Sequence, residues 1–381
     1  MILGINACRA RSGGAIAHLV GILNQVTPAE FGMHVVHVWS HTKLLAALPE
    51  VEWLIKHAPP DLERSLARQL LWERFSLPGE LQKVDCSMLL NVDAGSICRF
   101  QPAVTMSRDM LSYEPGEMRR YGITRAWLRL LFLQYVQARS LKRANGVIFL
   151  TNYAAKVIQE FTGPLPNFAV IPHGVGEAFR RRSADAIRPW PPGAAIRCVY
   201  VSNTEMYKHQ WEVVRAIADL RRRGHPIVLT LAGGGEGRAQ RKLNDEIAVT
   251  DPQHEFVRMV GAIAHDRLPD LLAESDIFVF ASSCESMPNT LVEAMAGGLP
   301  IACSDRGPMP EIMQDAGTYF NPEESGSIAQ AVEKLILEES FRQSAAKKAK
   351  VLSDQYSWER CARETWKFLA KTRENAIMLE H

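Results

Sequence analysis

Residues 280–311 read FASSCESMPNTLVEAMAGGLPIACSDRGPMPE, and strand and helix signals alternate along this stretch. The apolar run 277–280 predicts a buried strand that ends at a Ser-Ser-Cys turn. A short helix is expected over 291–295, because a glycine pair and a proline follow it. The next apolar run, 299–304, predicts a second strand. The stretch is therefore typical of a strand–loop–helix–strand unit in a parallel sheet.

The start of this short helix combines two kinds of chemistry. Pro288 supplies a turn, and Asn289 or Thr290 is the expected N-cap. Free backbone N–H groups and the positive end of the helix dipole favour an anion there. Glu285 and Glu293 flank the helix start and offer carboxylates to hydroxyl groups. A phosphate joined to a sugar has both features.

The same residues resemble a known family. Glu285, seven further residues and Glu293, followed by Ala-Met-Ala-Gly-Gly-Leu-Pro and a Pro-Glu pair at 310–311, are similar to the nucleotide-sugar signature of family-4 (group 1) retaining glycosyltransferases. The resemblance is specific in the second half of the chain and extends to the first half only in pattern. It implies the GT-B fold, in which two α/β domains with Rossmann-like, doubly wound parallel sheets face a cleft. It also implies a nucleotide-diphosphate sugar as donor substrate and no cofactor.

The resemblance assigns roles around the helix start. Glu293 is expected to accept hydrogen bonds from the ribose hydroxyls, and Glu285 from the hexose. The segment Pro288, Asn289 and Thr290 is expected to hold the diphosphate through backbone amides. No protein nucleophile is implied, because retention in this family is usually pictured as front-face attack in which the leaving phosphate helps to deprotonate the acceptor.

Strand and helix signals alternate along the whole chain, which predicts parallel sheets with right-handed crossovers. We expect an N-terminal acceptor-binding domain over 1–178. Charge and proline without periodicity mark a linker over 179–195. A nucleotide-sugar-binding domain is expected over 196–356, followed over 357–376 by a helix that in the resembled fold crosses back to the first domain. Residues 379–381 are interpreted as the remnant of an expression tag.

Periodicity places the individual elements. The expected strands are 1–7, 33–39, 87–92, 103–106, 147–150, 168–172, 196–201, 227–232, 256–260, 277–280 and 299–304. The expected helices are 15–25, 62–75, 117–121, 125–142, 153–161, 210–222, 238–246, 268–274, 291–295, 325–337, 341–356 and 358–372.

The loop after the strand 196–201 carries the expected cation. Lys208 matches the family lysine that neutralises the donor diphosphate, and a fixed cation there stabilises the charge that develops as the diphosphate leaves. The family usually has an arginine five residues earlier, where this chain has Asn203. Either Asn203 donates a neutral hydrogen bond to the diphosphate, or Arg9 or Arg11 substitutes for the missing charge. As an alternative, Lys208 is an ordinary surface lysine.

Glycines mark further loops at the carboxyl ends of strands. Gly13 and Gly14 follow the first strand and allow close approach of a ligand, although a plain tight turn gives the same pattern. Gly233 opens a glycine run whose spacing does not match a dinucleotide fingerprint, so we interpret it as a loop near the nucleotide. Gly261 and Ile263 resemble the family loop whose backbone contacts the base.

Arg108 and Asp109 follow the strand 103–106, where many members of the family carry a histidine or a polar pair that reaches the sugar or acceptor. We predict that they assist the chemistry, with a local salt bridge as the alternative. His173 ends another strand, and a hinge role for the glycine that follows is the favoured interpretation.

Charge divides unevenly along the chain. Residues 1–185 hold 21 Lys and Arg against 15 Asp and Glu, net +6, whereas the rest holds 23 against 27, net −4. A basic first half, with a basic amphipathic helix over 125–142, favours an anionic lipid or membrane surface as partner. Ordinary solvated charge on a core helix is the alternative. No nucleic-acid partner is expected.

Three further features of the sequence narrow the class of protein that is expected. They are the cysteines, the targeting signals and the spacing of the carboxylates. Seven scattered cysteines without a C-x-x-C pair indicate reduced thiols and no metal site. No apolar run approaches the roughly 20 residues of a membrane span and no signal peptide precedes the first strand, so a cytoplasmic protein is expected, with peripheral attachment to the inner face of the cytoplasmic membrane left open. No Asp-x-Asp occurs, which favours a metal-independent mechanism.

Together these observations predict a retaining glycosyltransferase. It would move a hexose from a nucleotide-diphosphate sugar to a glycan or lipid-linked acceptor in bacterial surface polysaccharide biosynthesis. A nucleotide-sugar 2-epimerase and a non-catalytic nucleotide-sugar-binding scaffold remain as alternatives. The second is encouraged by the unusual residues at positions 108, 109 and 203.

Overall fold

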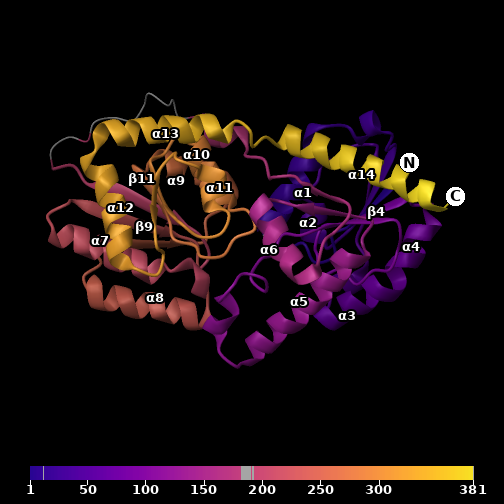
Figure 1. Cartoon of the computed structure of the whole chain (residues 1–381), viewed down its shortest axis with the longest axis horizontal. Helices are drawn as coiled ribbons and strands as arrows, with labels where there is room; N and C mark the ends of the chain where they lie inside the picture. Colours follow the sequence, from indigo (N-terminus) through magenta and orange to yellow (C-terminus); the bar gives the residue numbers. More distant parts are fainter. Residues whose placement is uncertain (12, 182–189, 191–192, 381) are drawn as a thin grey trace. The chain divides into compact units, whose positions relative to one another are not determined.

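The chain folds into two units, each built on one parallel sheet (Figure 1). The computed structural model describes residues 1–11, 13–181, 190 and 193–380. Unit 1 comprises Met1–Gly174 and Tyr356–His381, and unit 2 comprises Val175–Gln355. Most of the predicted linker 179–195, and the last residue of the predicted tag remnant, lie outside the described residues.

Unit 1 contains a seven-stranded sheet in the order β3-β2-β1-β4-β5-β6-β7. Every neighbouring pair is parallel. The strands are β1 (Ile2–Asn6), β2 (Val35–Trp39), β3 (Leu54–His57), β4 (Met88–Asn91), β5 (Ala103–Met106), β6 (Gly146–Phe149) and β7 (Phe168–Val170). Chain order reverses between β1 and β4, so this unit has its topological switch point there.

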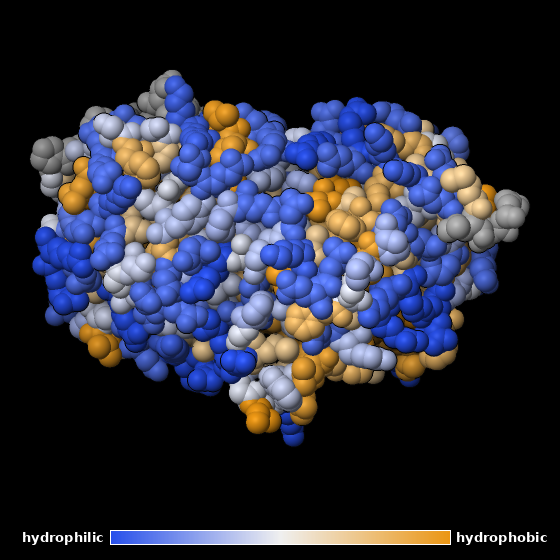
Figure 2. Space-filling model, viewed as in Figure 1, coloured by the Kyte–Doolittle hydropathy of each residue, from blue (hydrophilic) through white to orange (hydrophobic). Residues whose placement is uncertain are grey.

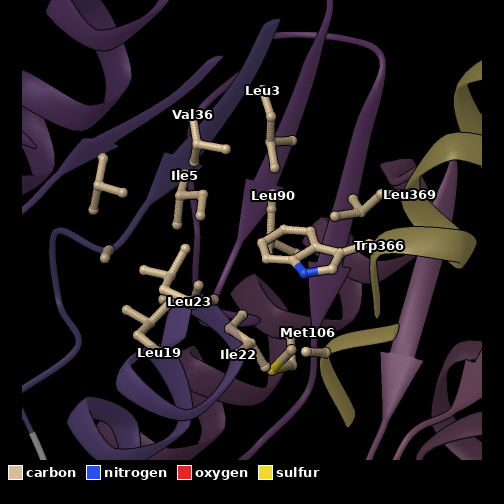
Figure 3. Close-up of a cluster of buried hydrophobic side chains, with 14 of the residues drawn as sticks. Leu3, Ile5, Leu19, Ile22, Leu23, Val36, Leu90, Met106, Trp366 and Leu369 are labelled. Carbon is tan, nitrogen blue, oxygen red and sulfur yellow. The ribbon is translucent and has the colours of Figure 1, made fainter. Parts of the chain in front are cut away.

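Helices cover the sheet of unit 1. They are α1 (Gly13–Gln25), α2 (Thr42–Leu45), α3 (Leu66–Leu71), α4 (Leu77–Lys83), α5 (Arg125–Arg143), α6 (Asn152–Thr162) and α14 (Trp358–Glu380). The last of these comes from the far end of the chain and packs beside α1 (Figure 1). Its Trp366 and Leu369 are fully buried in one cluster with Leu3 and Ile22 (Figure 3). Unit 1 therefore depends on both ends of the sequence.

Unit 2 contains a six-stranded parallel sheet in the order β10-β9-β8-β11-β12-β13. Its strands are β8 (Ile196–Val201), β9 (Ile227–Ala232), β10 (Val257–Gly261), β11 (Ile277–Phe280), β12 (Ile301–Ser304) and β13 (Thr318–Phe320). Its helices are α7 (Gln210–Arg222), α8 (Gly237–Thr250), α9 (Leu268–Ala273), α10 (Asn289–Ala296), α11 (Met309–Met313), α12 (Ser325–Leu337) and α13 (Glu339–Ser353). The switch point lies between β8 and β11. The predicted fold class, two Rossmann-like parallel sheets, is confirmed.

The prediction of one helix over 62–75 is wrong. A 3-10 turn over Pro60–Glu63 comes first, α3 follows, and the backbone then widens into a π-helical turn over Trp72–Ser76. The π turn contains Glu73, whose carboxylate is buried and accepts hydrogen bonds from Asn6 and Ser96. The pattern of leucines contained no signal for this polar contact. Five short elements, α2, β3, α4, α11 and β13, were also not predicted.

Trp366 tests how strongly α14 is held in unit 1. We expect Trp366→Ala to lower the free energy of unfolding of unit 1 by about 3–5 kcal/mol, because it removes a fully buried indole and leaves a cavity. Urea denaturation followed by circular dichroism measures the change. Lys367→Ala, at the exposed neighbouring position, should change it by less than about 0.5 kcal/mol. An equal loss in both variants would contradict the proposed packing role.

Candidate functional site in unit 2

The predicted donor residues gather at the switch point of unit 2. β8 and β11 are hydrogen-bonded neighbours, and each ends in a loop at the carboxyl edge of the sheet. Ligands of doubly wound sheets bind outside this edge, at the point where strand order reverses. The loop after β8 carries Lys208, and the loop after β11 carries Glu285.

Lys208 and Glu285 form an ion pair that joins the two loops. The Lys208 Nζ donates to Glu285 Oε1, and the two side chains are only 8% and 15% exposed. The same ammonium lies 5.4 Å from the ring centroid of Phe280 and 5.1 Å from that of Tyr207. Both charges are thus largely shielded from water. Each charge therefore depends on the other for compensation. Two of the four predicted catalytic residues are brought together.

The backbone around Lys208 is fixed by contacts to the neighbouring strands. The Tyr200 hydroxyl donates to the Lys208 carbonyl at 2.7 Å, and the Ser283 N–H donates to the Tyr207 carbonyl at 2.8 Å. His209 adopts a left-handed conformation with φ of 47°, which is unusual for a residue other than glycine. Its Nε2 lies 2.9 Å from the Ser283 hydroxyl. A strained backbone conformation persists only where several surrounding contacts fix it. The position of this loop is therefore firmly set.

The glycine run after β9 supports the same loop. A Cβ on Gly233 would stand 2.0 Å from the Ser202 carbonyl oxygen, and one on Gly235 would stand 2.6 Å from that of Thr204. The backbones therefore touch, which only glycine permits. Gly261 ends β10 with φ of +69° and accepts a 2.7 Å hydrogen bond from the Gly233 N–H. Gly261 is exposed, and Ile263 is half-buried just beyond it.

The N-terminus of α10 differs from its prediction. The N-cap is Pro288, with an extended backbone, and no side chain caps the helix, so the expectation of Asn289 or Thr290 at this position is wrong. The helix begins at Asn289, one residue earlier than it would if Asn289 were the N-cap. The first-turn amides thus lack a capping side chain. The Asn289 Oδ1 is buried without a hydrogen-bond partner. The geometry suits an anion at this helix start.

Glu293 lies within α10 and is buried, with 9% of its side chain exposed. Its Oε1 lies 2.9 Å from the Nε2 of His265, which belongs to the loop between β10 and α9. The hydrogen bond to Glu293 raises the pKa of His265 above its usual value of 6.5, although burial opposes the shift, and the charges of Glu293 and Asp266 add to it. His265 could not be predicted from the sequence, because one histidine in a loop has no diagnostic spacing.

Asn203 lies exposed in the loop after β8. Its proposed role as a neutral donor to the diphosphate stays a prediction. The two arginines considered as substitutes are engaged within unit 1. Arg9 pairs with Asp93 at 3.3 Å, and Arg11 donates to the Leu62 carbonyl at 2.6 Å.

Arg108 and Asp109 belong to unit 1, near its own switch point. They line a cavity of about 150 Å³ together with Arg9 and Asp93. Burial lowers the pKa of Arg108 to about 10 and raises that of Asp109. Among the described residues, no ion pair joins Arg108 to Asp109, so the local salt bridge is not found. Gly13 and Gly14 are the first residues of α1, and Gly13 faces open space.

No helix within the described part of the chain is long and apolar enough to cross a membrane. Among the same residues, no group of three or more His, Cys, Asp or Glu side chains is placed to hold a metal ion.

These features define the GT-B class of fold, with two Rossmann-like domains and polar loops at each switch point. Residues 191–352, which make up most of unit 2, match the family described as glycosyl transferases group 1. The resemblance found in the sequence is thereby confirmed over this part of the chain.

Solved structures share the fold along nearly the whole chain. Anabaena Alr3699/HepE in complex with UDP-glucose superimposes with a TM-score of 0.74 at 18% identity, over 97% of this chain and 100% of the other. A glycosyltransferase from Rickettsia africae superimposes with a TM-score of 0.70 at 14% identity, over 98% of each chain. At these identities the likeness concerns the fold.

Two curated relatives are similar over shorter regions. O-antigen chain mannosyltransferase B of Escherichia coli is 30% identical over 110 residues, 29% of this chain and 29% of the relative. The GDP-mannose-dependent alpha-(1-6)-phosphatidylinositol monomannoside mannosyltransferase of Mycobacterium tuberculosis is 26% identical over 253 residues, 61% of this chain and 64% of the relative. The matches thus span less than two thirds of these relatives.

The pair between Lys208 and Glu285 predicts non-additive stability. We expect Lys208→Met and Glu285→Gln each to lower the free energy of unfolding of unit 2 by about 3–5 kcal/mol, because each leaves one charge buried alone. The double variant should lose clearly less than the sum of the two. Denaturant titration of all four proteins completes the cycle. Strict additivity would show that the two charges are not coupled.

The pair between His265 and Glu293 predicts a titration shift. Because the folded-state pKa of His265 is raised, the pair stabilises unit 2 fully below the ordinary pKa of 6.5, and this contribution is lost as pH rises through the raised value. Glu293→Gln should return the pKa of His265 towards 6.5. NMR titration of the imidazole measures it, with Asp266→Asn as the matched control of smaller effect. An unchanged pKa in Glu293→Gln would contradict the assignment.

Proposed function

We propose that this protein is a retaining, metal-independent glycosyltransferase that moves a hexose from a nucleotide-diphosphate sugar to a glycan or lipid-linked acceptor. The observation that carries the proposal is the switch point of unit 2. There, the uncapped start of α10 lies in the loop–helix segment that also carries Glu285 and Glu293. The group 1 match covers this unit and supports the assignment.

The donor diphosphate would bind at the first turn of α10. Backbone amides at Asn289 and Thr290 would receive its charge, and Lys208 would supply the cation. In the structure, Lys208 is paired with Glu285. When the donor binds, the Lys208 ammonium would therefore interact with both a carboxylate and a phosphate. As the diphosphate leaves, its negative charge grows and its attraction to the Lys208 ammonium strengthens. This stronger interaction in the transition state lowers the barrier to transfer.

Two carboxylates would hold the hydroxyl groups of the donor. Glu293 would accept from the ribose, with His265 fixing the orientation of the carboxylate from its other side. Glu285 would accept from the hexose once Lys208 turns towards the phosphate. The exposed backbone at Gly261, with Ile263 beside it, would contact the base.

The acceptor would be handled by unit 1. Arg108 and Asp109 line a cavity at the carboxyl ends of its central strands, and Asp109 has a raised pKa suited to exchanging a proton. The E. coli relative acts on O-antigen and the M. tuberculosis relative on a phosphatidylinositol mannoside, as their names state. These names support a role in bacterial surface polysaccharide biosynthesis, at the inner face of the cytoplasmic membrane.

Donor transfer tests the proposal directly. The protein is incubated with radiolabelled UDP-glucose or GDP-mannose, with and without a lipid-linked saccharide acceptor and in the presence of EDTA. Label moving to the acceptor is the expected result. Isomerised donor without transfer would indicate a 2-epimerase, and tight binding without either reaction a scaffold, and each of these would overturn the proposal.

Two substitutions separate donor binding from turnover. Glu293→Gln should weaken donor binding about tenfold or more, because a carboxylate that accepts ribose hydrogen bonds becomes an amide. Lys208→Ala should chiefly lower kcat, by about 100-fold or more. Calorimetry and steady-state kinetics measure the two effects. Glu274→Gln, at an exposed position of the same unit, is the matched control and should leave both unchanged.

A further inference from the structure

The cavity of Arg108 and Asp109 in unit 1 lies at the carboxyl ends of three neighbouring strands. Arg9 follows β1, Asp93 follows β4 and Arg108 follows β5, and all three residues line the cavity. Its volume of about 150 Å³ is several times the roughly 30 Å³ that one water molecule occupies in the liquid. The cavity is therefore large enough to hold part of a small ligand.

Arg108 has no counter-charge in contact with it. Among the described residues, no ion pair joins its guanidinium to a carboxylate, and its Nε is buried without a hydrogen-bond partner. Burial lowers its pKa only to about 10, so the group stays charged at neutral pH. His18 and His173 are buried near it, and burial chiefly, aided by the charge of Arg108, holds the pKa of each well below 6.5. Both imidazoles are thus neutral and compensate no charge.

The other charged groups of the cavity have partners of their own. The Arg9 Nη2 lies 3.3 Å from the Asp93 Oδ1, and the Arg9 Nε lies 3.6 Å from the Glu73 Oε2. The Asp109 Oδ1 accepts a backbone N–H at 3.0 Å. The charge of Asp93 raises the pKa of Arg108, but the two side chains form no ion pair. Arg108 is therefore the cation that an anionic ligand would compensate, because a buried guanidinium without a counter-charge is costly.

The charge balance of the cavity favours a carboxylate over a phosphate. The carboxylates of Asp93 and Asp109 line the same cavity and would repel a second negative charge. A phosphate monoester carries about −1.5 to −2 at pH 7, whereas a carboxylate carries a single charge. A carboxylate is also planar and accepts two parallel hydrogen bonds from a guanidinium. It thus matches Arg108 in both charge and shape.

The remaining lining suits a sugar better than a hydrocarbon chain. Gln137 adds an amide, and the apolar lining residues are small: Ala10, Ala15, Val92 and Ala94. The large exposed apolar side chains of α5, such as Phe132 and Tyr135, do not line the cavity. Figure 2 shows hydrophobic surface along the lower edge of this unit, where Figure 1 places α5. The cavity itself is lined by charged, amide and small side chains.

We propose that the acceptor is a saccharide that carries a carboxylate, such as a uronic acid, and that the Arg108 guanidinium binds this carboxylate. The assignment rests on the proposed function, in which unit 1 holds the acceptor. With the carboxylate at Arg108, hydroxyl groups of the same sugar ring would lie beside Asp109 in the cavity. Arg108 is then a residue that determines acceptor specificity.

Binding of simple sugars to the whole chain, without donor, tests the proposal. NMR titration compares methyl glucuronide with methyl glucoside, which differ only in the carboxylate, and with glucose 6-phosphate. The glucuronide should bind at least about tenfold more tightly than the glucoside, because the charge-assisted pair is lost in the glucoside. It should also bind more tightly than glucose 6-phosphate. Equal binding of glucuronide and glucoside, or tighter binding of the phosphate, would overturn the proposal.

Two variants assign the preference to Arg108. Arg108→Gln should bind glucuronide and glucoside within about twofold of each other, and Arg108→Lys should keep part of the preference, because it keeps the charge without the planar fork. Arg68→Gln, at an exposed position of α3 outside the cavity, is the matched control and should keep all of it. Thermal melting checks that each variant is folded. An unchanged preference in folded Arg108→Gln would overturn the proposal.

Titration of the same samples with UDP and GDP separates this proposal from the proposed function. Nucleotide binding without a preference for the glucuronide would overturn the carboxylate site and leave the donor site standing. A preference for the glucuronide that depends on Arg108, in a protein that neither binds nucleotide nor transfers sugar, would support the carboxylate site and overturn the proposed function.

Discussion

The ion pair between Lys208 and Glu285 is the contact on which the proposed donor site depends. It joins the loops after β8 and β11 at the point where the strand order of unit 2 reverses. The loop after β8 is fixed by hydrogen bonds from Tyr200 and Ser283 and by the strained conformation of His209. The backbone of Gly233 also packs closely against this loop. These contacts fix both loops, and a fixed site would lower the cost of reorganisation in a reaction that separates charge.

The same pair explains how one cation could serve two stages of a reaction. The charge of a buried lysine is compensated by the carboxylate beside it, and this pairing limits its interaction with a phosphate. As transfer proceeds, the phosphate gains negative charge and competes better with the carboxylate for the lysine. At Glu293 the arrangement is similar, since His265 lies 2.9 Å from one oxygen of its carboxylate and compensates its charge.

Most of this architecture is predictable from the sequence, and the features that are not predictable depend on contacts between distant residues. The carboxylate spacing and the flanking glycines predicted the strand–helix–strand unit, because each residue there acts locally. The pairing of Lys208 with Glu285 spans 77 residues and depends on strand order, so no local pattern predicts it. His265 meets Glu293 for the same reason. The π turn around Glu73 was not predicted because Glu73 contacts Asn6 and Ser96, which lie 67 and 23 residues away in the chain. The N-cap was mispredicted because the sequence favours Asn289 or Thr290 as a capping side chain, and neither caps the helix.

The central claim is that the switch point of unit 2 binds a nucleoside diphosphate through the start of α10 and the loop of Lys208. Hydrogen-exchange mass spectrometry of the whole chain with UDP and with GDP tests it most directly. The account predicts that at least one nucleotide slows exchange in the first turn of α10 and in residues 202–208. Saturating nucleotide that protects neither segment, or protects only segments of unit 1, would contradict it.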